Sequence, residues 1–334
     1  MKKFLPIAVL CLPACALFGG LSEAELRQMN EHRVRCQKYF NARQFEKAID
    51  QAERGLAIDP TDYGLRSRLG WSYLELASRT KTNNIENLRR ARLIFSEIID
   101  WRGLDEHDSR TIFGYAKALH NQARIDELRA ELLLTESKIP GKKKADLIAE
   151  AKRHSSQSRK LDSQSEYYFL TLAEGKVAGR ANKREAYEYL MVLNYRAKDY
   201  QKAILYGTKN LELNEAEVKH WNEKYKTTKL PGYEALVRDE LSRLDKSAAA
   251  VHSSLAKYYR ESQDYDEAIA HLDAVIAARP RSYQEYYRRG VCYRKKSDHR
   301  RARKDFQTFL QMSDLPETDK FFQDAYEYVH GKGK

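Results

Sequence analysis

The chain has 334 residues, of which 32% are charged, and its mean hydropathy is −0.75, values that argue against a single compact core. With only 7 prolines and 15 glycines, few residues are set aside for turns. The net charge of +12 would suit nucleic acid, anionic lipid, an acidic protein face or simply a solvated basic surface, so it does not choose between them. Good helix formers fill most of the rest and strand-type alternation is almost absent, which predicts an all-α protein.

Residues 1–14 have the features of a secretory signal peptide. Lys2 and Lys3 form a positive amino-terminal region, and Phe4 to Leu12 form an apolar run. About nine apolar residues are too few to span a bilayer as a helix, which needs roughly 20. Loss of the two leader lysines would lower the net charge from +12 to +10.

The leader ends in Leu12-Pro13-Ala14-Cys15, which resembles the lipobox of bacterial lipoproteins. The resemblance implies cleavage before Cys15, acyl chains on that residue, and a lipid anchor with a short tether over 15–28. Several acyl chains anchor a protein stably, whereas one is marginal. Ala16 resembles the outer-membrane sorting signal of Gram-negative bacteria. The segment Ala14-Cys15-Ala16 also fits ordinary signal peptidase, which would release a free periplasmic protein beginning at Leu17.

Residues 34 positions apart share their type in two parts of the chain. Near the amino terminus, Cys36 pairs with Gly70 and Tyr39 with Tyr73. Near the carboxyl terminus, the pairs with this spacing are Ala256 and Gly290, Tyr259 and Tyr293, Ala268 and Ala302, Leu272 and Phe306, Val275 and Phe309, and Ile276 and Leu310. A fixed period of this length indicates stacked helical units, because one helix pair cannot bury its apolar face alone.

The pattern resembles the tetratricopeptide repeat family, whose signature has small residues at positions 8 and 20, aromatic residues at 11 and 24, and proline at 32. The matching repeats are 29–62, 184–217, 249–282 and 283–316. Small residues let two antiparallel helices approach closely, and a proline such as Pro60 or Pro280 ends the second helix. The resemblance implies an α-solenoid of stacked antiparallel helix pairs that winds into a right-handed superhelix.

The remaining segments depart from this register. Repeat 63–105 reaches its position-20 equivalent nine residues late, at Ala91, which predicts a longer loop over Ser78–Leu88. Residues 106–183 are helical in composition but out of register and broken at Pro140-Gly141, and an irregular hairpin turned by Leu230-Pro231-Gly232 is expected over 215–247. The predicted organisation is therefore repeats over 29–135, a degenerate helical region over 136–183, repeats over 184–316, and a capping helix (Asp319 to Val329) with its tail over 317–334.

The sequence carries no signature of catalysis, metal binding or cofactor binding. Its nine histidines are scattered, and it has no HExxH, GxSxG, P-loop or GxGxxG motif. Cys36, at repeat position 8, and Cys292 are expected to be buried structural thiols rather than reactive ones. Without CxxC spacing or a cysteine framework, neither zinc nor disulfides are expected. We predict a non-enzymatic protein with no cofactor and no metal.

In the tetratricopeptide family, the first helices line a concave groove with positions 2, 5, 9, 12 and 13, which share one helical face. The predicted partner-binding residues in the carboxyl-terminal repeats are Tyr195, Arg196, Lys257, Arg260, Tyr287, Arg294 and Lys295. Cations beside aromatic rings suit an acidic peptide or a chain terminus, although a solvated face remains the alternative. The carboxylate clamp of chaperone-binding members is not reproduced, because Arg33 and Gln37 occupy the corresponding positions.

Together these features predict a lipid-anchored scaffold, facing the periplasm from the outer membrane, that binds protein or peptide partners with acidic segments and serves the assembly of an envelope complex. The alternatives are a peptidoglycan- or carbohydrate-associated accessory protein and an unanchored periplasmic adaptor of an envelope enzyme. Two further basic segments, Lys138–Lys144 and Lys152–Lys160, suit nucleic acid or anionic head groups. Export and the lack of an interleaved aromatic motif argue against nucleic acid.

Overall fold

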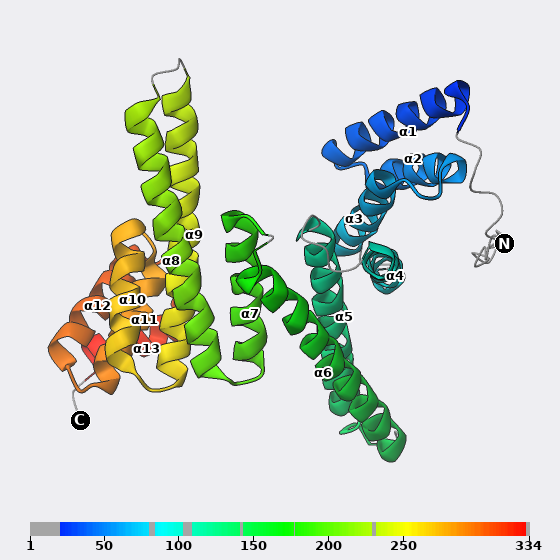
Figure 1. Cartoon of the computed structure of the whole chain (residues 1–334). Coiled ribbons are helices and arrows are strands. Elements are labelled where there is room, and N and C mark those ends of the chain that lie inside the picture. The colour runs from blue at the N-terminus through cyan, green and yellow to red at the C-terminus, as the bar shows by residue number, and fades with distance from the viewer. Residues whose placement is uncertain are drawn as a thin grey trace. The chain divides into compact units, whose positions relative to one another are not determined.

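The structure, a computed structural model, describes residues 21–79, 84–102, 109–140, 143–176, 178–228 and 232–331. Every regular element in these ranges is a helix (Figure 1), which confirms the predicted all-α class. The predicted signal peptide over 1–14 and the predicted lipid-modified Cys15 lie outside the described residues. The chain divides into two compact units, Met1–Leu104 and Asp105–Lys334, and the predicted repeat segment 29–135 extends across that division.

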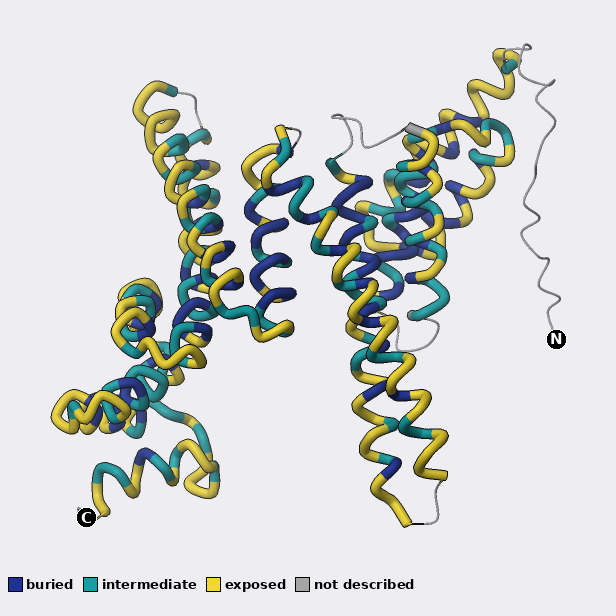
Figure 2. Tube along the Cα trace, turned by 60° about the horizontal axis from the view of Figure 1, so that its bottom comes forward, coloured by how far each residue is buried: buried dark blue, intermediate teal, exposed yellow. Residues whose placement is uncertain are grey.

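Both units are built from helices that pack against their neighbours in the chain. The helices of the first unit are α1 (Glu23–Asn41), α2 (Phe45–Ile58), α3 (Tyr63–Arg79) and α4 (Asn84–Arg102). Those of the second unit are α5 (Ser109–Glu136), α6 (Lys144–Glu174), α7 (Arg180–Arg196), α8 (Tyr200–Thr227), α9 (Tyr233–Glu261), α10 (Tyr265–Ala278), α11 (Tyr283–Lys295), α12 (His299–Met312) and α13 (Lys320–His330). Buried residues lie where paired helices face one another, as expected for stacked antiparallel pairs (Figure 2).

One turn is shared by the four predicted repeats. Within the described ranges, the non-glycine residues with positive φ are Arg43, Lys198, Gln263 and Ser297, with φ from 59° to 66°. Each occupies position 15 of its repeat and reverses the chain between the first and second helix. In three repeats the next residue is an aspartate whose side chain accepts a hydrogen bond from the first turn of the second helix. The same left-handed turn in all four repeats supports their common register.

Small residues at position 8 allow the close approach that the sequence predicted. A Cβ atom added at Gly290 would lie 3.0 Å from the ring of Phe306, and one added at Gly70 would lie 2.8 Å from the ring of Phe95. Cys36 holds the same position in the first repeat and is completely buried. Burial raises the pKa of the Cys36 and Cys292 thiols to about 11, and both are free, as expected for structural thiols.

One prediction about the spacers is wrong, and another needs its bounds extended. The loop expected over Ser78–Leu88 is shorter, because α3 continues to Arg79 and α4 begins at Asn84. Leu88 is buried, and its packing favours helix at the end of that segment. The hairpin predicted over 215–247 is present, with its turn between Thr227 and Tyr233, but its helices do not begin and end within that segment. They are the continuous extensions of α8 and α9, the second helix of one repeat and the first helix of the next.

The second unit therefore contains two hairpins that are longer than an ordinary repeat. Helices α5 and α6 have 28 and 31 residues, and α8 and α9 have 28 and 29, whereas α10 and α12 have 14 each. The predicted break at Pro140-Gly141 falls between α5 and α6. In Figure 1 both long hairpins extend well past the helices beside them.

The predicted capping helix is confirmed as α13, which packs on α12. It begins after Asp319, whose carboxylate accepts hydrogen bonds from the backbone N–H groups of Phe321 and Phe322. Its buried Ala325 shares a core cluster with Phe306 and Phe309 of α12. The last repeat pair is thus covered on its outer side.

Candidate binding face

The first helices of successive pairs in the second unit touch through their side chains, although they are not consecutive in the chain. Tyr195 of α7 stacks on Tyr258 of α9, with ring centroids 4.5 Å apart. Ser253 of α9 donates a hydrogen bond to the Glu285 carboxylate of α11 over 3.2 Å. We call the surface formed by α7, α9, α11 and α13 the first-helix face. It is the surface on which the sequence places its partner-binding residues.

An exposed cation lies on an aromatic stack where α7 meets α9. The Lys257 Nζ atom lies 4.2 Å from the centroid of the Tyr195 ring, which in turn stacks on Tyr258. Tyr258 is buried, and this burial raises the pKa of its hydroxyl to about 12. The stack fixes the Tyr195 ring under the ammonium group, while Lys257 itself stays exposed. Two of the seven predicted residues are therefore brought together.

Three predicted cations have no partner of opposite charge within the described part of the chain. These are Lys257, Arg260 and Lys295, none of which takes part in an ion pair there. Arg260 follows Lys257 by three residues and so lies on the same side of α9. Such unpaired cations attract an anionic ligand without first having to break an internal contact.

Two other predicted residues are bound to the capping helix instead. The Tyr287 hydroxyl donates to Asp324 Oδ2 over 2.7 Å, and Arg294 Nη1 donates to Asp324 Oδ1 over 2.9 Å. Burial and the hydrogen bond to Asp324 raise the pKa of Tyr287, while the charges of Arg294 and Arg260 act against that rise. Arg294 also lies over the Phe306 ring. These groups hold α13 in place, so the Tyr287 hydroxyl and Arg294 Nη1 already have a hydrogen-bond partner.

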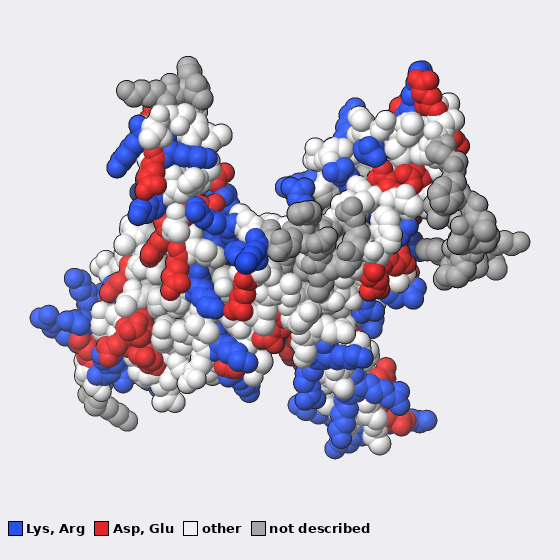
Figure 3. All heavy atoms as spheres, in the orientation of Figure 1, with Lys and Arg blue, Asp and Glu red and all other residues white. Residues whose placement is uncertain are grey.

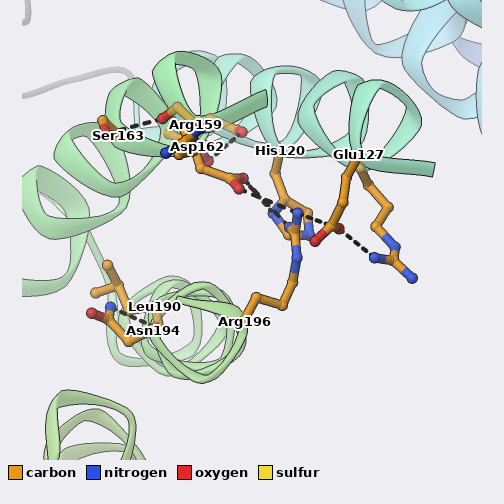
Figure 4. A network of polar contacts seen from close by, with 11 residues as sticks. His120, Glu127, Arg159, Asp162, Ser163, Leu190, Asn194 and Arg196 are labelled. Carbon is orange, nitrogen blue, oxygen red and sulfur yellow. Dashed lines mark hydrogen bonds and ion pairs between the residues drawn. The ribbon is translucent and has the colours of Figure 1, made fainter. Parts of the chain in front are cut away.

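The seventh predicted residue, Arg196, belongs to a polar network where α7 meets the α5–α6 hairpin (Figure 4). Its guanidinium group donates to Glu127 Oε2 over 2.7 Å and lies 3.2 Å from Asp162 Oδ2. Its side chain is only 15% exposed. An arginine that is mostly covered and lies between two carboxylates is a structural cross-link between three helices, because its charge is balanced internally.

The same network borders a polar cleft of about 590 Å³. Most side chains around it are charged or hydroxylated, Leu193 and Ala197 are apolar, and the amide of Asn194 donates to Glu166 Oε1 over 3.0 Å. The lining includes Glu127, Ser155, Arg159, Asp162, Ser163 and Arg196. His120 lies at the back of the network, with its Nδ1 atom 3.9 Å from Asp162 Oδ1.

Burial reverses the usual order of the pKa values of His120 and Asp162. Burial, helped by the charge of Arg196, lowers the pKa of His120 to about 4. Burial raises the pKa of Asp162 to about 6, and the nearby Arg196 only partly offsets this. The desolvation of Asp162 thus outweighs its ion pair. At neutral pH the imidazole is neutral and the carboxylate is ionised.

These two shifts predict opposite dependences of stability on pH. Between pH 6.5 and about 4, the unfolded chain protonates His120 but the folded protein does not, so acidification costs stability. Between pH 6 and 3.8, folded Asp162 holds a proton that the unfolded chain lacks, so acidification adds stability. As the pH falls from 7 to 4, the free energy of unfolding of His120→Asn should rise relative to that of the unchanged protein by on the order of 2–3 kcal/mol. That of Asp162→Asn should fall relative to the unchanged protein by a similar amount. Urea unfolding at several pH values measures this, and parallel curves for all three proteins would contradict it.

The repeat pattern did not reveal the internal partners of the predicted cations. Glu127 and Asp162 come from the out-of-register region, and Asp324 comes from the capping helix. Tyr258 was also missed, because the pattern drew attention to its neighbour Tyr259 at position 11. The spacing of Asp162 could have indicated its contact with Arg196, because the two residues are 34 positions apart, which is one repeat period.

The described helices include none that is both long and apolar enough to cross a membrane. Within the same ranges, no group of three or more histidine, cysteine, aspartate and glutamate residues could hold a metal ion.

A family model matches the carboxyl-terminal helix pairs. Residues 254–314 match the tetratricopeptide repeat family. This tetratricopeptide segment contains Lys257, Arg260 and Lys295. No curated protein matches the sequence.

Similar solved structures include a tetratricopeptide repeat protein from Parabacteroides merdae, 14% identical over 91% of this chain and 99% of that chain, with a TM-score of 0.37. The TPR2AB domain of yeast Sti1 in its complex with pHSP90 is 12% identical over 91% of this chain and 98% of that chain, with a TM-score of 0.31.

Proposed function

We propose that this protein is a non-enzymatic scaffold of the bacterial cell envelope that binds an acidic segment of a protein partner on the first-helix face. The observation that carries the proposal is the set of unpaired cations Lys257, Arg260 and Lys295, with Lys257 held over the Tyr195 ring. Carboxylates of a partner would gain charge-assisted hydrogen bonds there, and its aromatic side chains could pack on the exposed part of the stack. Stacked helical repeats characteristically offer such extended surfaces.

The location is part of the proposal and rests on the sequence. The leader over 1–14 and Cys15 after Leu12-Pro13-Ala14 support export and acylation, with the protein facing the periplasm from the outer membrane. Such an anchor would hold the first-helix face beside envelope proteins and favour a role in assembling or stabilising an envelope complex. Mass spectrometry of the mature amino terminus tests the anchor, and an unmodified chain that begins at Leu17 rules it out.

Charge reversal tests the binding face. Lys257→Glu with Arg260→Glu breaks no ion pair within the described residues, so helicity should be unchanged. Affinity for an acidic peptide, measured by fluorescence anisotropy, should fall at least tenfold, because charge-assisted hydrogen bonds are worth about 1.5–3 kcal/mol each. The matched control is Arg303→Glu with Lys304→Glu, an equal change on exposed residues of α12, a second helix.

Crosslinking in intact cells distinguishes a protein ligand from the alternatives. A photoreactive residue at position 257 should form adducts with a protein, and one at position 304 should not. Those adducts should disappear when Arg260→Glu is added. If only glycan or lipid is recovered at position 257, the scaffold proposal fails and a carbohydrate-associated role takes its place.

A further inference from the structure

The end of the α5–α6 hairpin combines basic and aliphatic residues in a way that the binding face does not explain. Residues 128–160, the outer part of this hairpin, contain nine lysines and arginines and four acids, Glu131, Glu136, Asp146 and Glu150, a net charge of +5 out of +12 for the whole chain. Lysines and arginines gather over this end of the hairpin in Figure 3. A large share of the net positive charge therefore lies on one projecting element.

The lysines described at this end form no ion pairs with other described residues of the protein. Lys138, Lys143, Lys144 and Lys152 are exposed and make no ion pair within the described ranges. Elsewhere basic residues do pair along a helix, as Arg35 does with Glu31 over 3.1 Å. A group of free ammonium ions at the end of an arm raises the local positive potential and attracts polyanions.

Aliphatic side chains are exposed among these lysines. Leu132 is 59% exposed and Ile139, next to the turn, is 51% exposed, and Leu128 and Leu134 are also exposed. Residues 129–160 contain no Phe, Tyr or Trp. Proteins that hold single-stranded nucleic acid stack its bases on aromatic rings, so this composition does not suit that ligand. Aliphatic groups beside lysines instead suit the boundary between phospholipid head groups and acyl chains.

We propose that the α5–α6 tip, the described residues 128–140 and 143–153, is a docking element for an anionic phospholipid bilayer. Lys138, Lys143 and Lys144 contact the lipid phosphates, while Ile139 and Leu134 enter the head-group region beside them. The proposal goes beyond the partner-binding face, and it does not depend on acylation of Cys15. A chain tethered at its amino terminus would then touch the membrane at a second point.

Vesicle binding tests the proposal on the chain from Leu21 to Lys334, which retains every described helix and lacks the leader. This protein should co-sediment with phosphatidylglycerol vesicles and not with phosphatidylcholine vesicles. Changing Lys138, Lys143 and Lys144 to glutamine should weaken binding about a hundredfold, since each lysine near an anionic surface contributes about a fivefold factor. The matched control changes the exposed Lys219, Lys224 and Lys226 of the α8–α9 hairpin to glutamine, with an expected effect below threefold.

A second variant separates lipid from other polyanions. Ile139→Ser should weaken vesicle binding about tenfold at unchanged charge, because less apolar surface leaves water. The proposal would be overturned if the α5–α6 lysine variant and the α8–α9 control variant lost vesicle affinity equally. It would also be overturned if the unchanged protein did not bind phosphatidylglycerol vesicles. Tighter binding of a poly(U) oligonucleotide than of vesicles, together with no effect of Ile139→Ser, would overturn it as well. The acidic-peptide measurement at Lys257 and Arg260 is independent, so failure of one proposal leaves the other standing.

Discussion

Replacing Arg184 with methionine should lower the free energy of unfolding of the second unit by about 3–5 kcal/mol. Arg184 Nε of α7 lies 3.0 Å from Glu217 Oε2 of α8, and the two side chains are 5% and 13% exposed. The two atoms are not aligned as a hydrogen bond, so the contact is an ion pair. Without the guanidinium group, a buried carboxylate is left uncompensated. Urea unfolding followed by circular dichroism measures the loss.

The double variant Arg184→Met with Glu217→Leu provides the control. It removes both charges and replaces them with apolar groups of similar volume, so stability should return to within about 1 kcal/mol of the original. A double variant as unstable as the single one would mean that Arg184 acts through packing. The nearby bond from Asn210 Nδ2 to the Arg184 carbonyl, 2.6 Å long, involves the backbone and should survive both changes.

Phe306→Ala should cost the second unit about 3–5 kcal/mol, because it opens a cavity where three helices meet. Phe306 of α12 is completely buried, lies against Gly290 of α11, and contacts the Tyr328 ring of α13 at 5.0 Å between centroids. Loss of the ring should also loosen α13. Thermal unfolding and proteolysis after residue 312 measure the two effects.

The variant Phe306→Leu keeps most of the volume and should cost less than half as much. If alanine and leucine are equally tolerated, the ring does not hold α12 against α11 and α13. Leu236→Ala, at an exposed position of α9, should change stability by less than about 0.5 kcal/mol and serves as the surface control.

The sequence was sufficient to predict the parts of the fold that follow the 34-residue period. Position 8 holds Cys36, Gly70 and Gly290, where helices approach too closely for a large side chain. Helices α2 and α10 end at Ile58 and Ala278, each two residues before the proline at position 32. These features are local or recur at fixed spacing, so a pattern of residue types identifies them.

The 34-residue pattern did not predict where the helices that join successive repeats begin and end. No proline or glycine interrupts the chain from Asn210 to Thr228, so α8 continues for 28 residues, and the second helix of one repeat becomes the first arm of the predicted hairpin. At Ser78–Leu88, polar residues predicted a loop, but burial of Leu88 extends α4 toward the turn. Tertiary packing decided the boundary there, and local composition did not.

The candidate site was predicted only in part for a related reason. Lys257 and Tyr195 meet because their helices are equivalent members of successive repeats. Whether a cation remains free depends instead on carboxylates that follow no repeat, such as Asp324 on the capping helix for Arg294 and Glu127 on α5 for Arg196. Those residues are 30 and 69 positions away, and only the structure shows that they meet.

The unequal lengths of the helix pairs also set a gradient of local stability within the second unit. Near its base, the α5–α6 hairpin is braced by α7, but among the described helices of this unit its outer half is supported mainly by the contact between its own two helices (Figure 1). Opening that half exposes little apolar surface, so it should cost less free energy than opening the stacked pairs. The residues that carry the lysines and Ile139 therefore sit on the part of the hairpin that can reshape itself against a surface while the stack behind it stays folded.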